Sequence, residues 1–466
     1  DPSRPTPALR RADGLDYVAT DRTVLFGHHF AAIAGAGPLV GPVLAAQMGY
    51  LPGTLWIIVG VVLAGAVQDF MILFVSMRRD GKSLGELIRM EMGQWAGTIA
   101  LFGAFMIMVI ILAVLALIVV KALAESPWGM FTVAATVPLA MMMGAYTRWI
   151  RPGRIGEVSL LGLVGLLAAI VYGQSVAASP FWGPIFTFTP LTLCWILIGY
   201  GAVASILPVW LLLAPRDYLS TFLKIGAIAA LAVGIVIMAP PLKMPALTQF
   251  VEGGGPVWSG GLFPFLFITI ACGAVSGFHA LISSGTTPKL IASEGHAPMI
   301  GYGAMLMEAF VAIMALVGAS ILDPGIYFTM NSPAALIGTD AASASAAVTA
   351  MGFPISPDLI TQTAKDVGEH SIISRAGGAP TLAVAMAEIF SHVVGGPAMK
   401  AFWYHFAILF EALFILTAVD AGTRAGRFML QDLIALAAPS FKESKSMVPG
   451  IVATALTVAA LSLIHI

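Results

Sequence analysis

The stretch FGHHFAAIAGAGPLVGPVLAA, Phe26 to Ala46, is apolar enough for a membrane yet carries four glycines and two prolines. Proline lacks a backbone donor and glycine loses more entropy than alanine in a helix, so this helix is expected to unwind near its middle. Unpaired backbone groups are costly in hydrocarbon, and a break is tolerated where protein, water or a ligand satisfies them. The alternative is that these glycines form a seam against which neighbouring helices pack closely.

The composition predicts an integral membrane protein whose surroundings are the lipid bilayer. Of 466 residues, 59% are hydrophobic and 10% are charged, against about 25% charged in soluble domains. The formal net charge of −1 gives no indication of a nucleic-acid partner. Cys194 and Cys272 both lie in apolar runs, so neither a disulfide framework nor a metal cluster is expected.

Apolar runs of roughly twenty residues, the length that crosses a bilayer, divide the chain into about eleven candidate spans. Met106 to Val120, MIMVIILAVLALIVV, is apolar without interruption, whereas a membrane barrel alternates apolar and polar residues. We therefore predict an all-α polytopic protein. The spans lie near residues 27–47, 53–76, 97–124, 130–147, 155–175, 191–214, 222–238, 261–285, 299–322, 401–420 and 448–463.

Basic residues predict the orientation of these spans. If the N-terminal segment is cytoplasmic, most of the 23 Lys and Arg fall in cytoplasmic segments, as the positive-inside rule requires. That set includes Arg216, Lys224, Arg424 and Arg427. The exceptions are Lys121, Lys243, Lys365, Arg375 and Lys400.

An extracytoplasmic insertion is expected over residues 323–400. Within it, Gly377 to Gly396 is apolar, bracketed by glycines and too short to span comfortably. Its length fits a re-entrant helix, and equally a helix lying on the surface of the bundle.

A second interrupted span is expected in GYGAVASILPVWLLLAPRDYL, Gly199 to Leu219, where two glycines one residue apart precede a proline. It lies five spans after the first and crosses in the opposite direction. Paired interrupted helices in two inverted halves indicate a secondary transporter with its site near the midplane. Free amides and the positive end of a half-helix there favour a carboxylate. The predicted substrate-binding residues are Gly35, Gly37, Pro38, Gly199, Gly201 and Ser205.

The chain also contains the strings DGLDYVATDRTVLFGHHFAAIAGAGPLVGPVLAAQMGYLPG, GVVLAGAVQDFMILFVSMRRDGKSLGEL, LPVWLLLAPRDYLSTFLKIG, FLFITIACGAVSGFHALISSGTTPK and FWYHFAILFEALFILTAVDAGTR. Together they closely resemble the carbon starvation protein A family of bacterial membrane transporters. The resemblance implies uptake of peptides or pyruvate across the inner membrane when preferred carbon is exhausted. It also implies the five-plus-five inverted-repeat (APC/LeuT-like) fold, with further helices before and after the matching region.

On that fold the chain divides as follows. Residues 1–25 form a cytoplasmic segment, 26–175 the first repeat, and 191–420 the second repeat, which contains the insertion 323–400. Residues 421–447 form a cytoplasmic loop and 448–466 an additional transmembrane helix.

Ionisable residues at membrane depth are functional candidates. Glu411 is the most deeply placed carboxyl and the first candidate to carry a coupling proton, with Glu308 second and His279 as a relay. For Asp69 and Asp420 we expect instead a permanent partner, an arginine or a helix end.

Sodium is the alternative coupling ion. Hydroxyls late in the eighth span, Ser283, Ser284 and Thr287, would join carbonyls of the broken first span, since hard cations prefer oxygen ligands. A fixed ammonium, such as Lys289, would take the place of sodium in a proton-coupled carrier, and proton coupling is favoured. The adjacent His28 and His29 point about 100° apart on a helix and cannot share one ion. No metal site and no cofactor are predicted.

These expectations combine into a proton-coupled secondary active transporter that imports short peptides or pyruvate by alternating access. The sequence carries no zinc-protease, triad or phosphate-loop motif, so an enzyme is not expected. The alternatives are a sodium-coupled carrier of the same fold and a membrane nutrient receptor or sensor.

Overall fold

The computed structural model describes residues 3–124, 126–438, 441 and 448–465, and their regular structure is helical apart from one isolated bridge between Thr20 and Ile291. The first half of the chain contains α1 (Pro7–Arg10), α2 (Arg22–Ile33), α3 (Gly37–Ala45), α4 (Tyr50–Gly60), α5 (Ala66–Arg78), α6 (Leu84–Met92), α7 (Gln94–Leu123), α8 (Pro127–Ala145), α9 (Ile155–Ala178), α10 (Trp182–Ile185), α11 (Pro190–Ile206) and α12 (Leu213–Met238). The second half contains α13 (Leu262–Thr269), α14 (Ala271–Ala274), α15 (Gly277–Gly285), α16 (Ala304–Ile321), α17 (Pro324–Asn331), α18 (Ala334–Ile337), α19 (Ala341–Ala350), α20 (Pro357–Asp366), α21 (Ala379–Val393), α22 (Lys400–Ala435) and α24 (Val448–His465). Short 3-10 segments are η1 (Ala46–Met48), η4 (Gln249–Glu252), η5 (Thr287–Lys289), η6 (Glu294–His296) and η8 (Pro397–Met399), and π-helical turns are η2 (Val61–Gly65), η3 (Tyr146–Ile150) and η7 (Pro298–Gly303).

Within the described ranges, seven helices are long and apolar enough to cross a membrane, and an eighth span is formed if the bent pair α2 and α3 is counted as one. The sequence predicts about eleven. The remaining three predicted spans are present as shorter pieces: Pro190–Ile206 and Val448–Leu461 are shorter apolar helices, and residues 261–285 are divided into α13, α14 and α15. The all-helical membrane architecture is therefore confirmed, with fewer uninterrupted spans than predicted.

The first span is interrupted where its glycines predict it. Asp21 caps α2 by accepting a hydrogen bond from the Thr23 amide at 2.8 Å. The helix ends at Ile33, and α3 continues from Gly37 after a bend of 45°. Pro38 lies in the first turn of α3, where its missing amide donor is not needed.

The stretch Gly199 to Leu219, in which an interruption is predicted, does leave the helix, but it does so after its paired glycines. Helix α11 runs without a break from Pro190 to Ile206. The backbone leaves the helical region at Leu207, with φ −60° and ψ 150°, because a residue that precedes proline disfavours the helical conformation. The next helix begins at Leu213, so the chain breaks after the glycines instead of at them.

The eighth span contains an interruption that the sequence analysis does not predict. The chain leaves the helix at Ile270 and again at Val275 and Ser276, where the backbone is extended. This segment packs directly against α3: a β-carbon added at Gly41 would lie 2.1 Å from the Thr269 carbonyl oxygen. Two interrupted spans therefore lie side by side, and small residues permit the close approach.

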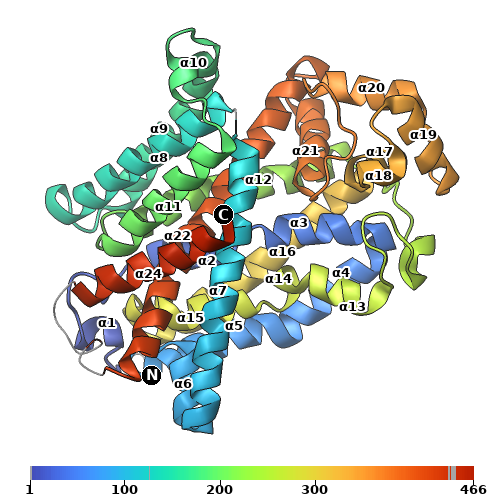
Figure 1. Cartoon of the computed structure of the whole chain (residues 1–466). Helices are drawn as coiled ribbons and strands as arrows, with labels where there is room; N and C mark the ends of the chain where they lie inside the picture. Colours follow the sequence, from blue (N-terminus) through green and yellow to red (C-terminus); the bar gives the residue numbers. More distant parts are fainter. Residues whose placement is uncertain (1–2, 125, 439–440, 442–447, 466) are drawn as a thin grey trace.

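The insertion 323–400 forms helices α17 to α21. Helices α17 to α20 gather at the upper right of Figure 1, while the N-terminus lies at the lower left. Helix α21 is buried over most of its length and contacts α3, α12, α16 and α22, so it is not a helix on the surface of the bundle. The Tyr327 hydroxyl of α17 donates to the Val43 and Leu44 carbonyls at 2.8 and 3.0 Å. The insertion thereby supports the end of α3.

Several basic residues that were assigned to cytoplasmic segments lie inside helices. Arg216 and Lys224 are buried within α12, and Arg424 and Arg427 are buried within α22. Helix α22 continues to Ala435, so residues 421–435 of the expected cytoplasmic loop are helical. These buried cations require partners, and those partners define the candidate site.

Candidate functional site

The break in the first span is occupied by a buried ammonium. The Lys224 Nζ atom of α12 donates to the Ala31 and Ala34 carbonyls, both at 2.9 Å. It also donates to the Thr417 hydroxyl of α22 at 2.7 Å, and it lies 4.2 Å from the centre of the Phe414 ring. The Gly35 amide donates to Ile33 instead of closing a helical bond to Ala31. Lys224 therefore satisfies carbonyls that the break leaves without helical partners.

The predicted substrate residues of the first span are tightly packed. A β-carbon added at Gly37 would lie 2.2 Å from the Cys272 β-carbon, and one added at Gly35 would lie 3.2 Å from that of Ala418. Pro38 is buried beside them. Both interpretations of these glycines hold, because the helix breaks here and neighbouring helices approach it closely.

The predicted substrate residues of α11 lie on different surfaces. Gly199 is exposed, and a β-carbon added there would meet no atom within 4 Å. A β-carbon added at Gly201 would lie 3.4 Å from the Thr423 hydroxyl oxygen of α22. The Ser205 hydroxyl is buried, 3.2 Å from that of Thr454 in α24. Gly201 and Gly35 thus both face α22, whereas Gly199 does not face the bundle.

Four side chains from four helical elements meet in what we call the His279 cluster: Asp69 of α5, Cys272 of α14, His279 of α15 and Glu308 of α16. The His279 Nδ1 atom lies 2.9 Å from Asp69 Oδ2, and its Nε2 atom lies 2.8 Å from Glu308 Oε2. The Cys272 thiol donates to Glu308 Oε1 at 3.3 Å and lies 3.7 Å from His279 Nε2. Asp69 was expected to pair with an arginine or a helix end, and its partner is a histidine.

A second buried group contains the other acid for which a permanent partner was predicted. Asp420 of α22 forms an ion pair with Arg216 of α12. It also accepts a hydrogen bond from the Tyr200 hydroxyl at 2.8 Å, and Arg216 donates to the same hydroxyl at 2.6 Å. The prediction of an arginine partner for Asp420 is confirmed.

The adjacent histidines, His28 and His29, form hydrogen bonds with different helices. The His28 Nδ1 atom lies 2.7 Å from the Asp217 carboxylate of α12, and the His29 Nδ1 atom lies 2.8 Å from the Thr287 hydroxyl. As predicted, the two rings do not converge on one point. Each Nε2 atom is buried and has no hydrogen-bond partner in the described part of the chain.

The hydroxyls expected to bind sodium do not converge on the first break. The Ser284 hydroxyl donates to the Ala280 carbonyl of its own helix at 2.8 Å. The Thr287 hydroxyl is hydrogen-bonded to His29 Nδ1. Ser283 is buried with no hydrogen-bond partner among the described residues. The carbonyls of the break are held by Lys224 and Thr417 instead.

Glu411 lies in α22 and is buried, as its sequence position predicts. Its Oε1 atom has no hydrogen-bond partner in the ranges that the structure describes. A charged carboxylate without a partner is costly to bury.

A charged cavity of about 870 Å³ lies beside the N-terminal segment. Lys289 lines it, with its ammonium 3.0 Å from the centre of the Phe428 ring. Asp16 of the segment pairs with Arg424 at 2.6 Å and with Arg427 at 2.8 Å. Burial opposes ionisation of Asp16, but the Arg427 and Arg424 guanidinium groups outweigh it, and the pKa of the carboxyl falls below its ordinary 3.8. The segment is thus fastened to α22 by charge.

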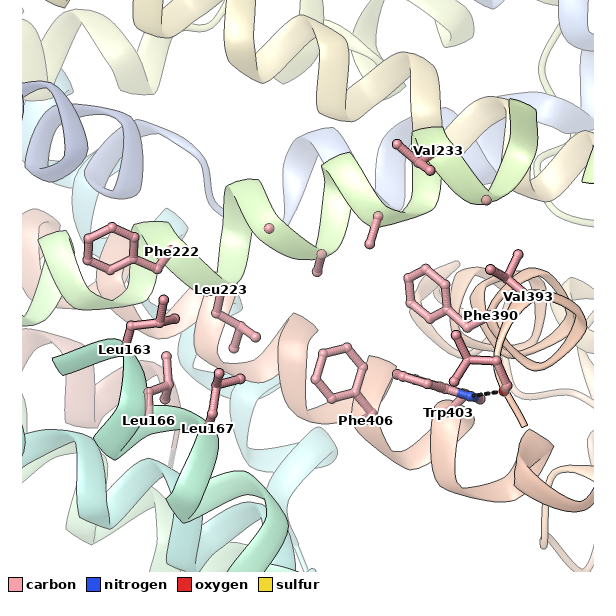
Figure 2. A pocket seen from close by; sticks show the side chains of 15 residues that line it. Leu163, Leu166, Leu167, Phe222, Leu223, Val233, Phe390, Val393, Trp403 and Phe406 are labelled. Carbon is pink, nitrogen blue, oxygen red and sulfur yellow. Dashed lines mark hydrogen bonds between the residues drawn. The ribbon is translucent and has the colours of Figure 1, made fainter. Parts of the chain in front are cut away.

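Figure 2 shows a second cleft, of about 360 Å³, between α9, α12, α21 and α22. Its lining is apolar and includes Leu166, Phe222, Phe390 and Phe406. The Trp403 indole N–H is already donated to the Val394 carbonyl at 3.1 Å. This cleft offers no group that would bind a carboxylate.

Lys224 and Cys272 are the site residues that the sequence analysis missed. The only signal at Lys224 was a single cation just inside an apolar run, which the charge pattern placed at a cytoplasmic boundary. Cys272 appeared to be a packing residue, because nothing in the sequence brings it to Glu308.

Comparison with known proteins gives a consistent result over the whole chain. Residues 1–466 match the family described as Carbon starvation protein CstA. The chain is 70% identical to the peptide transporter CstA of Escherichia coli (strain K12) over 99% of its length, and 65% identical to the pyruvate/proton symporter BtsT of the same organism over 98%. It is 45% identical to the peptide transporter CstA of Bacillus subtilis (strain 168) over 92% of its length and 69% of that protein. The chain spans 66% of the length of each of the two Escherichia coli relatives.

Proposed function

The chain belongs to the carbon starvation protein CstA family, and from this premise we propose that it is a secondary active transporter of small carboxylates. Its substrates are short peptides, pyruvate or both, imported across the bacterial inner membrane by alternating access. The N-terminal segment lies on the cytoplasmic side. The two interrupted spans packed side by side support a five-plus-five inverted-repeat fold, because transporters of that kind place their sites at discontinuous helices.

The observation that carries proton coupling is the Lys224 ammonium at the break of the first span. Sodium in such a carrier is bound by carbonyls of an unwound helix together with hydroxyls. Here Lys224 contacts the Ala31 and Ala34 carbonyls and the Thr417 hydroxyl. A lysine that donates to these oxygens leaves them unavailable to sodium. The relative that is 65% identical to this chain is a pyruvate/proton symporter, which agrees with a proton as the coupling ion.

The chemistry of Lys224 suggests how the release of a proton changes the conformation of the interrupted first span. An ammonium has three N–H donors, which match the three oxygen acceptors at Lys224. A neutral amine has two N–H donors, so loss of the proton removes one of the three hydrogen bonds that Lys224 donates to α2 and α22. Proton release would therefore loosen the interrupted span, the element that we propose opens and closes the substrate site.

Glu411 is the proposed second titrating group. It lies on α22, the helix that also supplies Thr417 to Lys224. One of its buried oxygens has no hydrogen-bond partner among the described residues, and burying an unpaired charge costs more than burying a neutral polar group. Glu308 and His279, already in contact with each other, are the second route for the proton.

The substrate carboxylate is proposed to bind where α3 begins, at the Gly37 amide, in a state of the carrier in which Cys272 has moved away from its close contact with Gly37, because the positive end of a helix attracts anions. The charged cavity at the N-terminal segment is proposed as the cytoplasmic vestibule. The ion pairs of Asp16 with Arg424 and Arg427 would close this vestibule in one state of the carrier and break to open it in the other.

Counterflow into proteoliposomes tests this function. Vesicles preloaded with unlabelled substrate should transiently accumulate labelled pyruvate, or a labelled dipeptide or tripeptide, with no ion gradient. A carrier gives this overshoot, whereas a channel or receptor does not. Absence of counterflow with both pyruvate and the peptides would reject the proposal.

A further inference from the structure

The His279 cluster contains three donors of the kinds that bind transition metals. The Cys272 sulfur, a His279 ring nitrogen and a Glu308 carboxylate oxygen all lie within 4.8 Å of one another. His279 and Glu308 are fully buried, and Cys272 is half-buried. They belong to α14, α15 and α16, so their convergence is a product of the fold and not of local sequence.

Asp69 orients the histidine as a metal ligand requires. Its Oδ2 atom lies 2.9 Å from the Nδ1 atom of His279, so it can accept a hydrogen bond from a ring proton on that nitrogen. The other nitrogen, Nε2, then presents its lone pair towards the Cys272 sulfur and the Glu308 carboxylate, 3.7 and 2.8 Å away. A carboxylate behind a ligating histidine is the usual outer partner in zinc sites.

The spacing of the donors also suits a metal. A tetrahedral ion with the usual zinc bond lengths separates its nitrogen, sulfur and oxygen ligands by about 3.3 to 3.6 Å. Nε2 lies 3.7 Å from Sγ and 2.8 Å from one Glu308 oxygen, Oε2, while Sγ lies 3.3 Å from the other, Oε1; the nitrogen, the sulfur and a single carboxylate oxygen lie within 4.8 Å of one another. Small side-chain movements bring all three atoms into a shell of this size.

The charges of the His279 cluster also favour a bound cation. Two carboxyl groups and one thiol surround a single histidine, and the Asp69 Oδ1 atom is buried with no hydrogen-bond partner within the described residues. A divalent cation would neutralise a thiolate and a carboxylate together, and binding would release the protons they carry.

We infer that Cys272, His279 and Glu308 form a binding site for a divalent transition metal of the zinc class, with Asp69 orienting His279. Three protein ligands leave the fourth position open to water or another small donor. Cys272 lies on α14, the segment between the two interruptions, and against Gly37 of the first span. The metal would therefore fasten this interrupted segment to α16.

Metal analysis of the purified protein tests this site without reference to transport. The protein, carrying no polyhistidine tag, is incubated with zinc sulfate, passed through a desalting column and measured by elemental mass spectrometry. We expect about one zinc per chain, lost in Cys272→Ser and in His279→Ala. The matched control is Cys194→Ser, which alters the other cysteine, in α11, and should retain the metal.

Cobalt substitution reports the sulfur ligand directly and covers the case in which His279→Ala fails to fold. Cobalt-loaded protein should show a thiolate-to-cobalt charge-transfer band that Cys272→Ser removes and Cys194→Ser leaves intact. Zinc content unchanged by Cys272→Ser, or a cobalt spectrum without a band that depends on Cys272, would overturn the proposal. Glu308 cannot ligate a metal ion and carry a proton at the same time. A metal bound at this site would therefore remove Glu308 from the proposed proton route.

Discussion

Replacing Lys224 with methionine removes the ammonium while keeping a side chain of similar length. Afterwards the Ala31 carbonyl still accepts from Thr417 at 2.8 Å, whereas Lys224 is the partner found for the Ala34 carbonyl. One buried acceptor left unpaired costs about 1 to 3 kcal/mol, which a membrane protein of ordinary stability survives. The variant should therefore fold and reach the membrane.

Its transport should be uncoupled. One proton moving down a gradient of one pH unit supplies about 1.36 kcal/mol, which is a tenfold accumulation of substrate. Proteoliposomes with wild-type protein and an acidic exterior should approach that ratio for each proton carried. Lys224→Met should exchange substrate in counterflow but bring the internal concentration only to the external one.

The control is Lys243→Met, because Lys243 is exposed in the loop after α12. It should accumulate substrate as the wild type does. If Lys224→Met accumulates substrate against the pH gradient like the wild type, Lys224 is a structural cation and the coupling argument fails.

Three further predictions concern other residues. Glu411→Gln should keep counterflow and lose accumulation driven by the pH gradient, and a wild-type response would make Glu411 structural and move the assignment to Glu308. Asp16→Asn should lower the melting temperature in detergent at pH 7, by an amount equivalent to about 2 kcal/mol. Because the folded pKa of Asp16 lies below 3.8, its stabilisation is fully present above that value and is lost as the pH falls through the folded pKa, so the difference between the two proteins should vanish in strong acid. Gly41→Ala should greatly reduce the yield of folded protein, since its β-carbon would lie 2.1 Å from a carbonyl oxygen, whereas Gly199→Ala meets open space and should be neutral; equal yields would contradict the packing of the two interrupted spans.

The sequence predicts the helical membrane fold and the first break because both depend on local composition. An uninterrupted apolar run in a bilayer forms an α-helix, which pairs its backbone groups within the segment. Glycines with proline weaken a helix wherever they lie. The arginine partner of Asp420 is predictable for a similar reason, since a buried carboxylate needs a counter-ion.

Glycine content alone does not locate the second break. Gly199 and Gly201 resemble Gly35 and Gly37 in spacing, yet α11 continues through them and ends at Leu207 beside Pro208. Glycine weakens a helix by about 1 kcal/mol, and packing overrides that amount readily. At the interruption of the eighth span, the Ser276 carbonyl accepts a hydrogen bond from the Gln68 side chain of α5 at 2.6 Å, a contact that local sequence does not reveal.

The partners of the candidate site come from distant parts of the chain. Lys224 is 193 residues from both Ala31 and Thr417, so its role depends on how α2, α12 and α22 pack. Cys272 and His279 would be about 10.5 Å apart along an unbroken helix, and the interruption between them allows the sulfur and Nε2 to lie 3.7 Å apart. Both the contacts of Lys224 and the His279 cluster form at interruptions in helices. The order of polar residues along the sequence does not show which of them meet there.

Uptake by the wild-type protein under a single imposed gradient tests the central claim most directly. Proteoliposomes are given labelled pyruvate, or the peptide that shows counterflow, under an inward pH gradient without sodium, and separately under an inward sodium gradient at equal pH. The account predicts accumulation with the pH gradient alone, abolished by a protonophore, and none with sodium alone. Accumulation driven by sodium at equal pH would contradict it, because the oxygens at the first break would then have to bind sodium where Lys224 now lies.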